Sequence, residues 1–100
     1  MARRQRRWEV QAETRAQLKA ALAALVPGQQ VIVFGSLVKP GRFHDRSDVD
    51  LALESEPPGM DSWRLSAELM ERLNRPVDVV LLKRCRFREK IRKEGEVWIA

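Results

Sequence analysis

The chain has 100 residues, of which 44% are hydrophobic and 33% are charged, and its formal net charge at pH 7 is +5. This length suits one compact domain and leaves no room for a second core, and the composition excludes a disordered chain. No apolar run is long enough to span a bilayer, and no apolar segment of a secretory signal follows the basic start. We therefore expect a single domain over residues 1–100, located in the cytoplasm, with no membrane partner.

The positive charge is concentrated at the two ends of the chain. Residues 1–20 hold six Arg and Lys against two Glu, and residues 83–94 hold seven against two, whereas residues 21–82 hold six basic and nine acidic side chains. The ends could meet an acidic or phosphate-bearing partner, or they could be amphipathic helices with solvated basic faces. The single cysteine, Cys85, excludes an intramolecular disulfide and a cysteine zinc site.

The first half of the chain predicts a helix, a strand and a loop. Residues 8–26 carry leucines at helical spacing, and Pro27-Gly28 ends the pattern. Residues 30–34 are apolar and rich in β-branched side chains, which indicates a buried strand. Residues 37–47 are rich in turn formers and predict a turn or short helix followed by a loop.

Residues 48–53 predict a second strand with two different faces. Side chains alternate along a strand, so Asp48 and Asp50 share one face, and the apolar side chains between them share the other. A third strand is predicted over residues 77–82, where Asp78 interrupts an apolar run.

Two more helices and a tail complete the predicted order. A helix capped by Asp61 or Ser62 should continue to about residue 73, a final helix should span residues 84–94, and residues 97–99 should be a short extended tail. This order predicts a small α/β domain with a three-stranded sheet. The side chains expected to face the core from these two helices are Trp63, Ala67, Met70 and Leu73, then Phe87 and Ile91.

Three aspartates occupy strand positions that are flanked by apolar residues. Asp48 and Asp50 project to the same side, and Asp78 lies beside them if the third strand neighbours the second. Crowded carboxylates repel one another unless a cation is present, and hard oxygen ligands suit Mg²⁺ that also contacts substrate phosphates. The alternative is that these carboxylates are strand-end or edge charges satisfied by backbone amides and water.

The Gly35-Ser36 pair directly follows the first predicted strand. Glycine allows a close approach of the backbone to a ligand, and amides at the start of a helix bind phosphate oxygens. Taken alone, this pair predicts only a turn. Combined with the aspartates, it predicts a nucleotide triphosphate held between backbone donors and metal ions.

The combination of Gly35-Ser36, Asp48-x-Asp50 and Asp78 resembles the DNA polymerase β-type nucleotidyltransferase superfamily. It is most similar to the minimal nucleotidyltransferases, the antitoxins of two-gene modules that also encode a HEPN-domain toxin. The resemblance covers roughly residues 15–100. It implies the polymerase β-like fold, with a small mixed three-stranded sheet packed against helices.

The resemblance also implies a role for each motif residue. Asp48 and Asp50 would bind both of two Mg²⁺ ions, and Asp78 would help to bind the catalytic ion and act as a base or position the attacking hydroxyl. Relatives often carry Arg at the position of Leu37, so one phosphate contact is absent from this chain. The implied nucleotide-binding residues are Gly35, Ser36, Lys39 and Ser47.

The implied function is transfer of AMP from ATP to a tyrosine of the HEPN toxin, which silences it. The chain contains no Tyr, so a tyrosine acceptor must belong to another molecule. One alternative is an antitoxin that neutralises its partner by binding alone, with the basic last helix as a candidate surface. Another is an enzyme that modifies a small hydroxylated molecule. Direct nucleic-acid binding ranks last, because no aromatic-rich basic platform is present.

Overall fold

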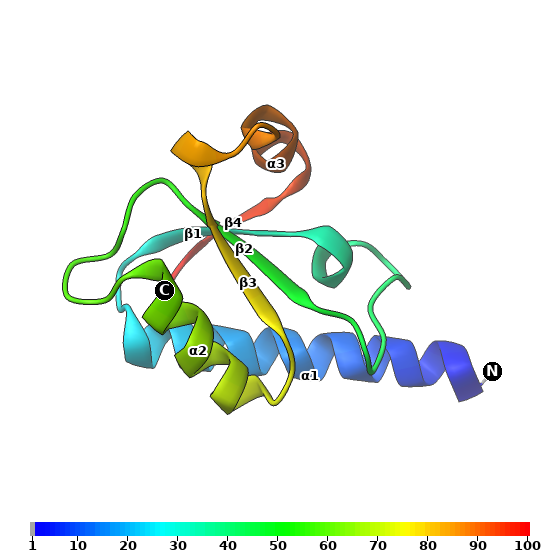
Figure 1. Ribbon diagram of the computed structural model, residues 1–100. Coiled ribbons are helices and arrows are strands. Elements are labelled where there is room, and N and C mark those ends of the chain that lie inside the picture. The colour runs from blue at the N-terminus through cyan, green and yellow to red at the C-terminus, as the bar shows by residue number, and fades with distance from the viewer. Residues whose placement is uncertain (1) are drawn as a thin grey trace.

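The computed structural model describes residues 2–100, with side chains from Arg6 onward. Within this range a single mixed sheet is flanked by helices, as Figure 1 shows. The helices are α1 (Ala2–Leu25), α2 (Ser62–Leu73) and α3 (Arg88–Glu94), the strands are β1 (Gln30–Phe34), β2 (Val49–Leu53), β3 (Val77–Leu81) and β4 (Glu96–Ile99), and the short 3-10 turns are η1 (Gly35–Val38) and η2 (Leu82–Arg84). No helix of the described part is long and apolar enough to cross a membrane.

The sheet has four strands in the order β3-β2-β1-β4. β2 and β3 are parallel, whereas β1 is antiparallel to both β2 and β4. The mixed α/β class is confirmed, but the prediction of three strands was wrong. The predicted extended tail pairs with β1 as β4, with Trp98 opposite Val31.

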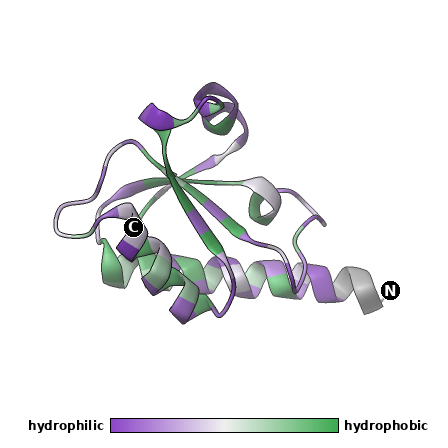
Figure 2. Cartoon of the chain, viewed as in Figure 1, coloured by the Kyte–Doolittle hydropathy of each residue, from purple (hydrophilic) through white to green (hydrophobic). Residues whose placement is uncertain are grey.

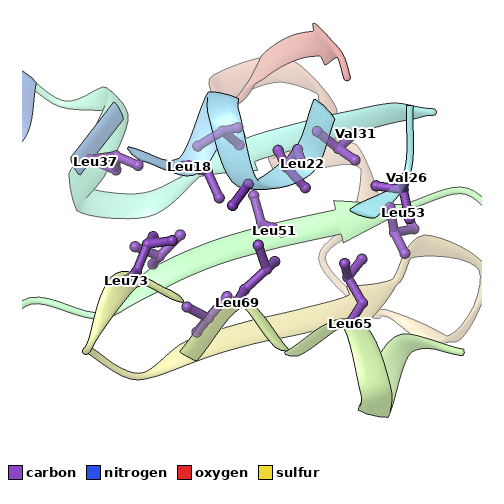
Figure 3. Close-up of a cluster of buried hydrophobic side chains, with 14 of the residues drawn as sticks. Leu18, Leu22, Val26, Val31, Leu37, Leu51, Leu53, Leu65, Leu69 and Leu73 are labelled. Atoms are coloured by element: carbon purple, nitrogen blue, oxygen red, sulfur yellow. The ribbon is translucent and has the colours of Figure 1, made fainter. Parts of the chain in front are cut away.

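The main core lies between the sheet and the two longer helices. In Figure 1, α1 and α2 cover one face of the sheet and α3 lies on the other. Figure 3 shows Leu18 and Leu22 of α1 meeting Leu51 of β2 and Leu69 of α2, and all four are fully buried. The apolar positions of β2 therefore face α1 and α2, which turns the intervening Asp50 toward the α3 side.

Helix α2 buries a different face from the one predicted. Its buried side chains are Leu65, Leu69 and Leu73, which recur every four residues. The predicted core residues Trp63 and Met70 are instead 86% and 43% exposed. Packing of the three leucines against α1 and β3 fixes the rotation of α2, and this rotation leaves Trp63 in solvent.

The termini of α2 agree with the sequence. The carboxylate of Asp61 accepts a hydrogen bond of 2.8 Å from the backbone N–H of Arg64, which caps the first turn. Asn74 ends the helix in the left-handed conformation.

Helix α3 is shorter than predicted, because η2 ends at Arg84 and residues 85–87 form a turn before the helix begins at Arg88. Ile91 is buried against Ile32 and Ala52 on the α3 side of the sheet, as expected. The prediction that Phe87 faces the core was wrong, because this side chain is 67% exposed just before α3 begins.

Candidate functional site

Two of the predicted site aspartates lie side by side on the α3 face of the sheet. Asp50 of β2 and Asp78 of β3 are direct partners in the parallel register, and neighbouring strands lie about 4.8 Å apart. Asp50 is half-buried on a central strand, whereas Asp78 is exposed on an edge strand. Asp48 is exposed and immediately precedes β2.

The electrostatic environment of Asp50 is unfavourable to its charged form. Burial raises the pKa of Asp50 from 3.8 to about 6, and the negative charges of Asp78 and Asp48 act in the same direction. Among the side chains that the structure describes, no Lys, Arg or His forms a salt bridge with Asp50, so no cation compensates these effects. The described residues contain no group of three His, Cys, Asp or Glu side chains placed to hold a metal ion without other ligands. The metal-binding roles of Asp48, Asp50 and Asp78 therefore stay predictions.

Gly35 brings the backbone against the carboxylate of Asp50. Its φ of +77° lies in the left-handed region, which favours glycine. A side-chain carbon at this position would lie 3.3 Å from the Asp50 carboxyl carbon and would collide with its Oδ2 oxygen. The turn after β1 thus requires glycine for two independent reasons, and η1 starts directly beside the aspartate pair.

These residues open into a cleft of about 820 Å³ that is lined from both α2 and α3 and includes β3, the edge strand of the sheet. Gly35, Asp50 and Asp78 contribute to its wall, and Lys39 is the predicted phosphate-binding cation that reaches it. The remaining wall comes from α2, β3, η2 and α3. It includes the aromatic side chains of Trp63 and Phe87 and the basic side chains of Arg84 and Lys90.

Other predicted nucleotide-binding residues lie outside this lining. Ser47 is buried, and its hydroxyl accepts a hydrogen bond of 3.0 Å from the backbone N–H of His44. Ser36 is half-buried in η1, next to Gly35. Leu37 is fully buried in the main core (Figure 3), which accounts for an apolar residue at this position. The nucleotide-binding roles of Ser36 and Ser47 stay predictions.

Arg75 supports the loop that leads to the aspartates, and sequence reasoning missed it. Its guanidinium donates hydrogen bonds to the carbonyls of His44 (3.2 Å) and Ser47 (2.9 Å) and lies 4.7 Å from the ring centroid of Phe43. Phe43 is fully buried, so the stack fixes the loop against the core. The sequence marked Arg75 only as part of a helix-ending stretch.

Gln11 of α1 supports the turn after β1 in a similar way. Its side-chain amide donates a hydrogen bond of 2.7 Å to the carbonyl of Leu37 and a longer one of 3.4 Å to that of Lys39. The side chain is only 7% exposed. A buried polar side chain usually has a hydrogen-bond partner, but burial is not visible in the sequence, so residue type and spacing gave no signal for this contact.

Comparison with known proteins agrees with this geometry. The family described as "Polymerase beta, Nucleotidyltransferase" matches residues 16–99. No curated protein matches the chain. Among solved structures, a chain of a toxin–antitoxin crystallised with AMP-PNP is 24% identical, with a TM-score of 0.62 over 85% of this chain and 73% of that one. A chain of the toxin–antitoxin MntA-HepT is 20% identical, with a TM-score of 0.59 over 89% and 73%. These two likenesses show the fold, and the family match over most of the length shows that this chain belongs to the polymerase β nucleotidyltransferase family.

Proposed function

We propose that this chain is a Mg²⁺-dependent nucleotidyltransferase that transfers AMP from ATP to a tyrosine of a partner HEPN-domain toxin and so acts as its antitoxin. The observation that carries this proposal is the pairing of Asp50 with Asp78 beside the glycine turn, inside an open cleft. Family membership supports nucleotidyl transfer in general. The toxin–antitoxin structures with the same fold, one of them with AMP-PNP, support the choice of partner and nucleotide.

The residues present fit a magnesium ion. Asp50 carries a charge that burial and its two acidic neighbours disfavour, and a cation would relieve this cost. Mg²⁺ is commonly held by one or two carboxylates, with substrate phosphates and water as the other ligands, so a site without a third protein ligand is sufficient. When bound, the ion would neutralise charge on the phosphates and orient them.

The chain's own residues would divide the remaining work. Asp50 and Asp78 would hold the ion, with Asp48 as a further ligand at the start of β2. The backbone at Gly35-Ser36 and the side chain of Lys39 would bind the β- and γ-phosphates. The exposed carboxylate of Asp78 would accept the proton of the tyrosine hydroxyl. The tyrosine oxygen would then form a bond to the α-phosphorus of ATP, and the bond between this phosphorus and the pyrophosphate leaving group would break.

A second candidate function is neutralisation of the toxin by binding alone. The exposed basic surface of η2 and the start of α3 favours it, since Lys83, Arg84, Arg86 and Lys90 all lie in solvent there. Figure 2 shows this region as strongly hydrophilic. Such a surface suits an acidic partner whether or not a nucleotide is transferred.

The test is transfer of label from ATP that carries ³²P at the α-phosphate to a purified HEPN-domain toxin, with and without Mg²⁺. We expect label on the partner only when Mg²⁺ and an intact Asp50 are present. Absence of transfer, together with full protection of cells by Asp50→Ala, would refute the enzymatic proposal and favour neutralisation by binding.

A further inference from the structure

The open edge of β3 lies along the cleft. β3 pairs with β2 on one side, and no other strand of the described chain pairs with its second side. Val79, Val80 and Leu81 of this strand all contribute to the cleft wall. An exposed strand edge presents backbone N–H and C=O groups that can pair with an added strand.

The direction of these backbone groups follows from two hydrogen bonds. The N–H of Val49 donates to the carbonyl of Pro76 at 3.0 Å, so Pro76 faces β2. Because successive residues of a strand point their backbone groups to opposite sides, Asp78 also faces β2, and Val77 and Val79 face outward. The hydroxyl of Ser66 confirms this, since it donates to the outward carbonyl of Val77 at 2.5 Å.

By this alternation Val77, Val79 and Leu81 face outward, and Val79 is the central one of these three positions. Within the described residues, no hydrogen bond involves its backbone N–H or C=O. Its side chain is half-buried on the α2 side, packed against the main core. Edges of this kind are usually blunted or covered in natural proteins, and here only the Val77 carbonyl is occupied, by Ser66.

Two exposed aromatic side chains flank this edge. Trp63 reaches the cleft from the first turn of α2, and Phe87 reaches it from the residue before α3. Both are largely in solvent, and exposed aromatic side chains beside a pocket are typical anchors of an interface. The charged residues that line the cleft are Lys39, Arg84 and Lys90 together with Asp50, Asp78 and Glu94. The excess of positive charge lies at η2 and the start of α3, where Lys83, Arg84, Arg86 and Lys90 are exposed, so this end of the cleft suits a segment that carries apolar and acidic residues.

We propose that an extended, acidic segment of the partner protein adds to the sheet beside β3 and pairs with the backbone of Val79. Alternate side chains of this segment would pack on Trp63 and Phe87, and its carboxylates would face Arg84 and Lys90. The proposal rests on the proposed function in one respect: a residue of this segment next to Asp78, on the α3 face, would carry the acceptor hydroxyl. Strand addition thus places an acceptor beside the aspartate pair.

A second copy of this chain fits this edge less well than a different protein. Twofold symmetry requires two β3 edges to pair antiparallel. With Val79 at the centre, Lys83 of one copy would lie opposite Arg75 of the other, so two paired copies would bring like charges together. An acidic partner segment meets the same edge with complementary charge.

The decisive variant is Val79→Pro, with Val97→Pro as a matched control. Proline is tolerated on a strand edge where the missing N–H faced outward, as at Val79. Val97 holds the equivalent place on the opposite edge. The N–H of Ala100 donates to the Gln29 carbonyl on the β1 side, so alternation turns the backbone of Val97 away from β1. Each variant removes one outward N–H and leaves the ladder within the sheet intact.

Affinity for the purified HEPN-domain toxin is measured by calorimetry without nucleotide. We expect Val79→Pro to weaken binding at least tenfold, because a hydrogen bond is lost and the ring obstructs the added strand, and Val97→Pro to stay within twofold of wild type. Wild-type affinity in Val79→Pro, or equal losses in both variants, would overturn the proposal.

Hydrogen exchange of the wild-type protein gives an answer that does not depend on the folding of a variant. We expect the Val79 amide to exchange at least tenfold more slowly in the complex than in the free chain, and the Val97 amide to be unchanged. Unchanged exchange at Val79, or protection that requires only a second copy of this chain, would overturn the proposal. Both measurements omit ATP, so a failure of AMP transfer alone would count against the proposed function and leave the docking edge standing.

Discussion

Replacing Asp50 with asparagine should stabilise the metal-free protein at neutral and alkaline pH. The folded state raises the pKa of Asp50 from 3.8 to about 6, so it binds this proton more tightly than the unfolded state does. The contribution of Asp50 to stability is therefore most favourable below about pH 4, falls as the pH rises to about 6, and then stays level. An asparagine side chain cannot ionise, so the Asp50→Asn variant escapes this loss.

The size of the effect follows from the pKa difference. A change from 3.8 to about 6 corresponds to about 3 kcal/mol for a fully buried group. Asp50 is only half-buried, and solvent screening reduces the contribution to about 1–2 kcal/mol. We expect Asp50→Asn to raise the free energy of unfolding by this amount at pH 8 and to have almost no effect at pH 4.

Without metal, Asp50→Asn should be more stable than the wild type at pH 8; with Mg²⁺ and ATP, the wild type should be the more stable protein. Mg²⁺ with ATP should stabilise the wild type through mass action and should have little effect on Asp50→Asn, because a charged ligand is missing. Urea unfolding followed by tryptophan fluorescence gives the free energy of unfolding of each protein at pH 4 and pH 8, with and without Mg²⁺·ATP. Asp45→Asn is the matched control, since Asp45 is an exposed loop carboxylate with only a 3.4 Å contact to Arg6, and its effect should stay below about 0.5 kcal/mol.

One result would refute this reasoning about Asp50. If Asp50→Asn destabilises the metal-free protein at pH 8, the carboxylate is a structural hydrogen-bond acceptor and its pKa is not raised. If Asp50→Asn is more stable than the wild type but is still stabilised by Mg²⁺·ATP, then the charge of Asp50 is unfavourable in the folded state but Asp50 does not bind the ion.

Two further changes test the supports of the site, and a third tests an ion pair between α1 and β4. Gly35→Ala should cost about 2–3 kcal/mol and abolish Mg²⁺·ATP binding, since it combines a φ of +77° with a collision against Asp50. Gly41→Ala has a similar φ of +69° and open space, so it should cost only about 1 kcal/mol; equal costs in chemical denaturation would contradict the collision. Arg75→Lys should weaken Mg²⁺·ATP binding several-fold in calorimetry, because one ammonium cannot hold both loop carbonyls and stack on Phe43; unchanged binding would show that the loop does not need this support. The pKa of Glu96 is lowered by its hydrogen bonds from Arg15, so this pair stabilises the fold above the ordinary glutamate pKa and less as the pH falls through the lowered value. Glu96→Gln should therefore remove less than about 1 kcal/mol at pH 7, with no difference from wild type in acid; a difference that persists in acid would argue against the ion pair.

The parts of the fold that the sequence predicted well depend on short-range patterns. Alternation in β2 placed Asp50 on the face opposite the buried leucines, and the Asp61 cap located the start of α2. Both follow from periodicity and local hydrogen bonding, which are properties of neighbouring residues.

The errors arose where distant segments decide the outcome. The rotation of α2 depends on which of two overlapping apolar stripes packs against α1 and β3. The stripe of leucines is buried there, and the stripe that contains Trp63 and Met70 is exposed. β4 has only four residues, which is too short for a periodic signal. Its pairing with β1 joins residues more than sixty positions apart, so the sequence indicated an extended tail but not a strand.

The site shows the same division between local and distant information. Asp50 and Asp78 are partners because β2 and β3 are neighbouring parallel strands. Two strands that are joined through a helix usually pair in this way, so the helix predicted between them favoured this arrangement. Arg75 and Gln11 act on backbone carbonyls far away in the chain. Backbone carbonyls carry no sequence signature, so contacts of this kind cannot be found from residue types and spacing.

The position of each aspartate in the sheet gives it a different access to solvent. β2 has neighbours on both sides, so Asp50 is half-buried where a rigid strand can hold a bound cation in place. β3 has an open side, so Asp78 is exposed next to the edge that a further strand can approach. A carboxylate that must accept a proton from an incoming hydroxyl has to be reachable from that side, whereas one that mainly binds the metal does not. The strand order β3-β2-β1-β4 therefore favours the inner aspartate for the ion and the outer one for the acceptor, and a partner segment added at Val79 would complete the arrangement from the side of Asp78 that the described chain leaves open.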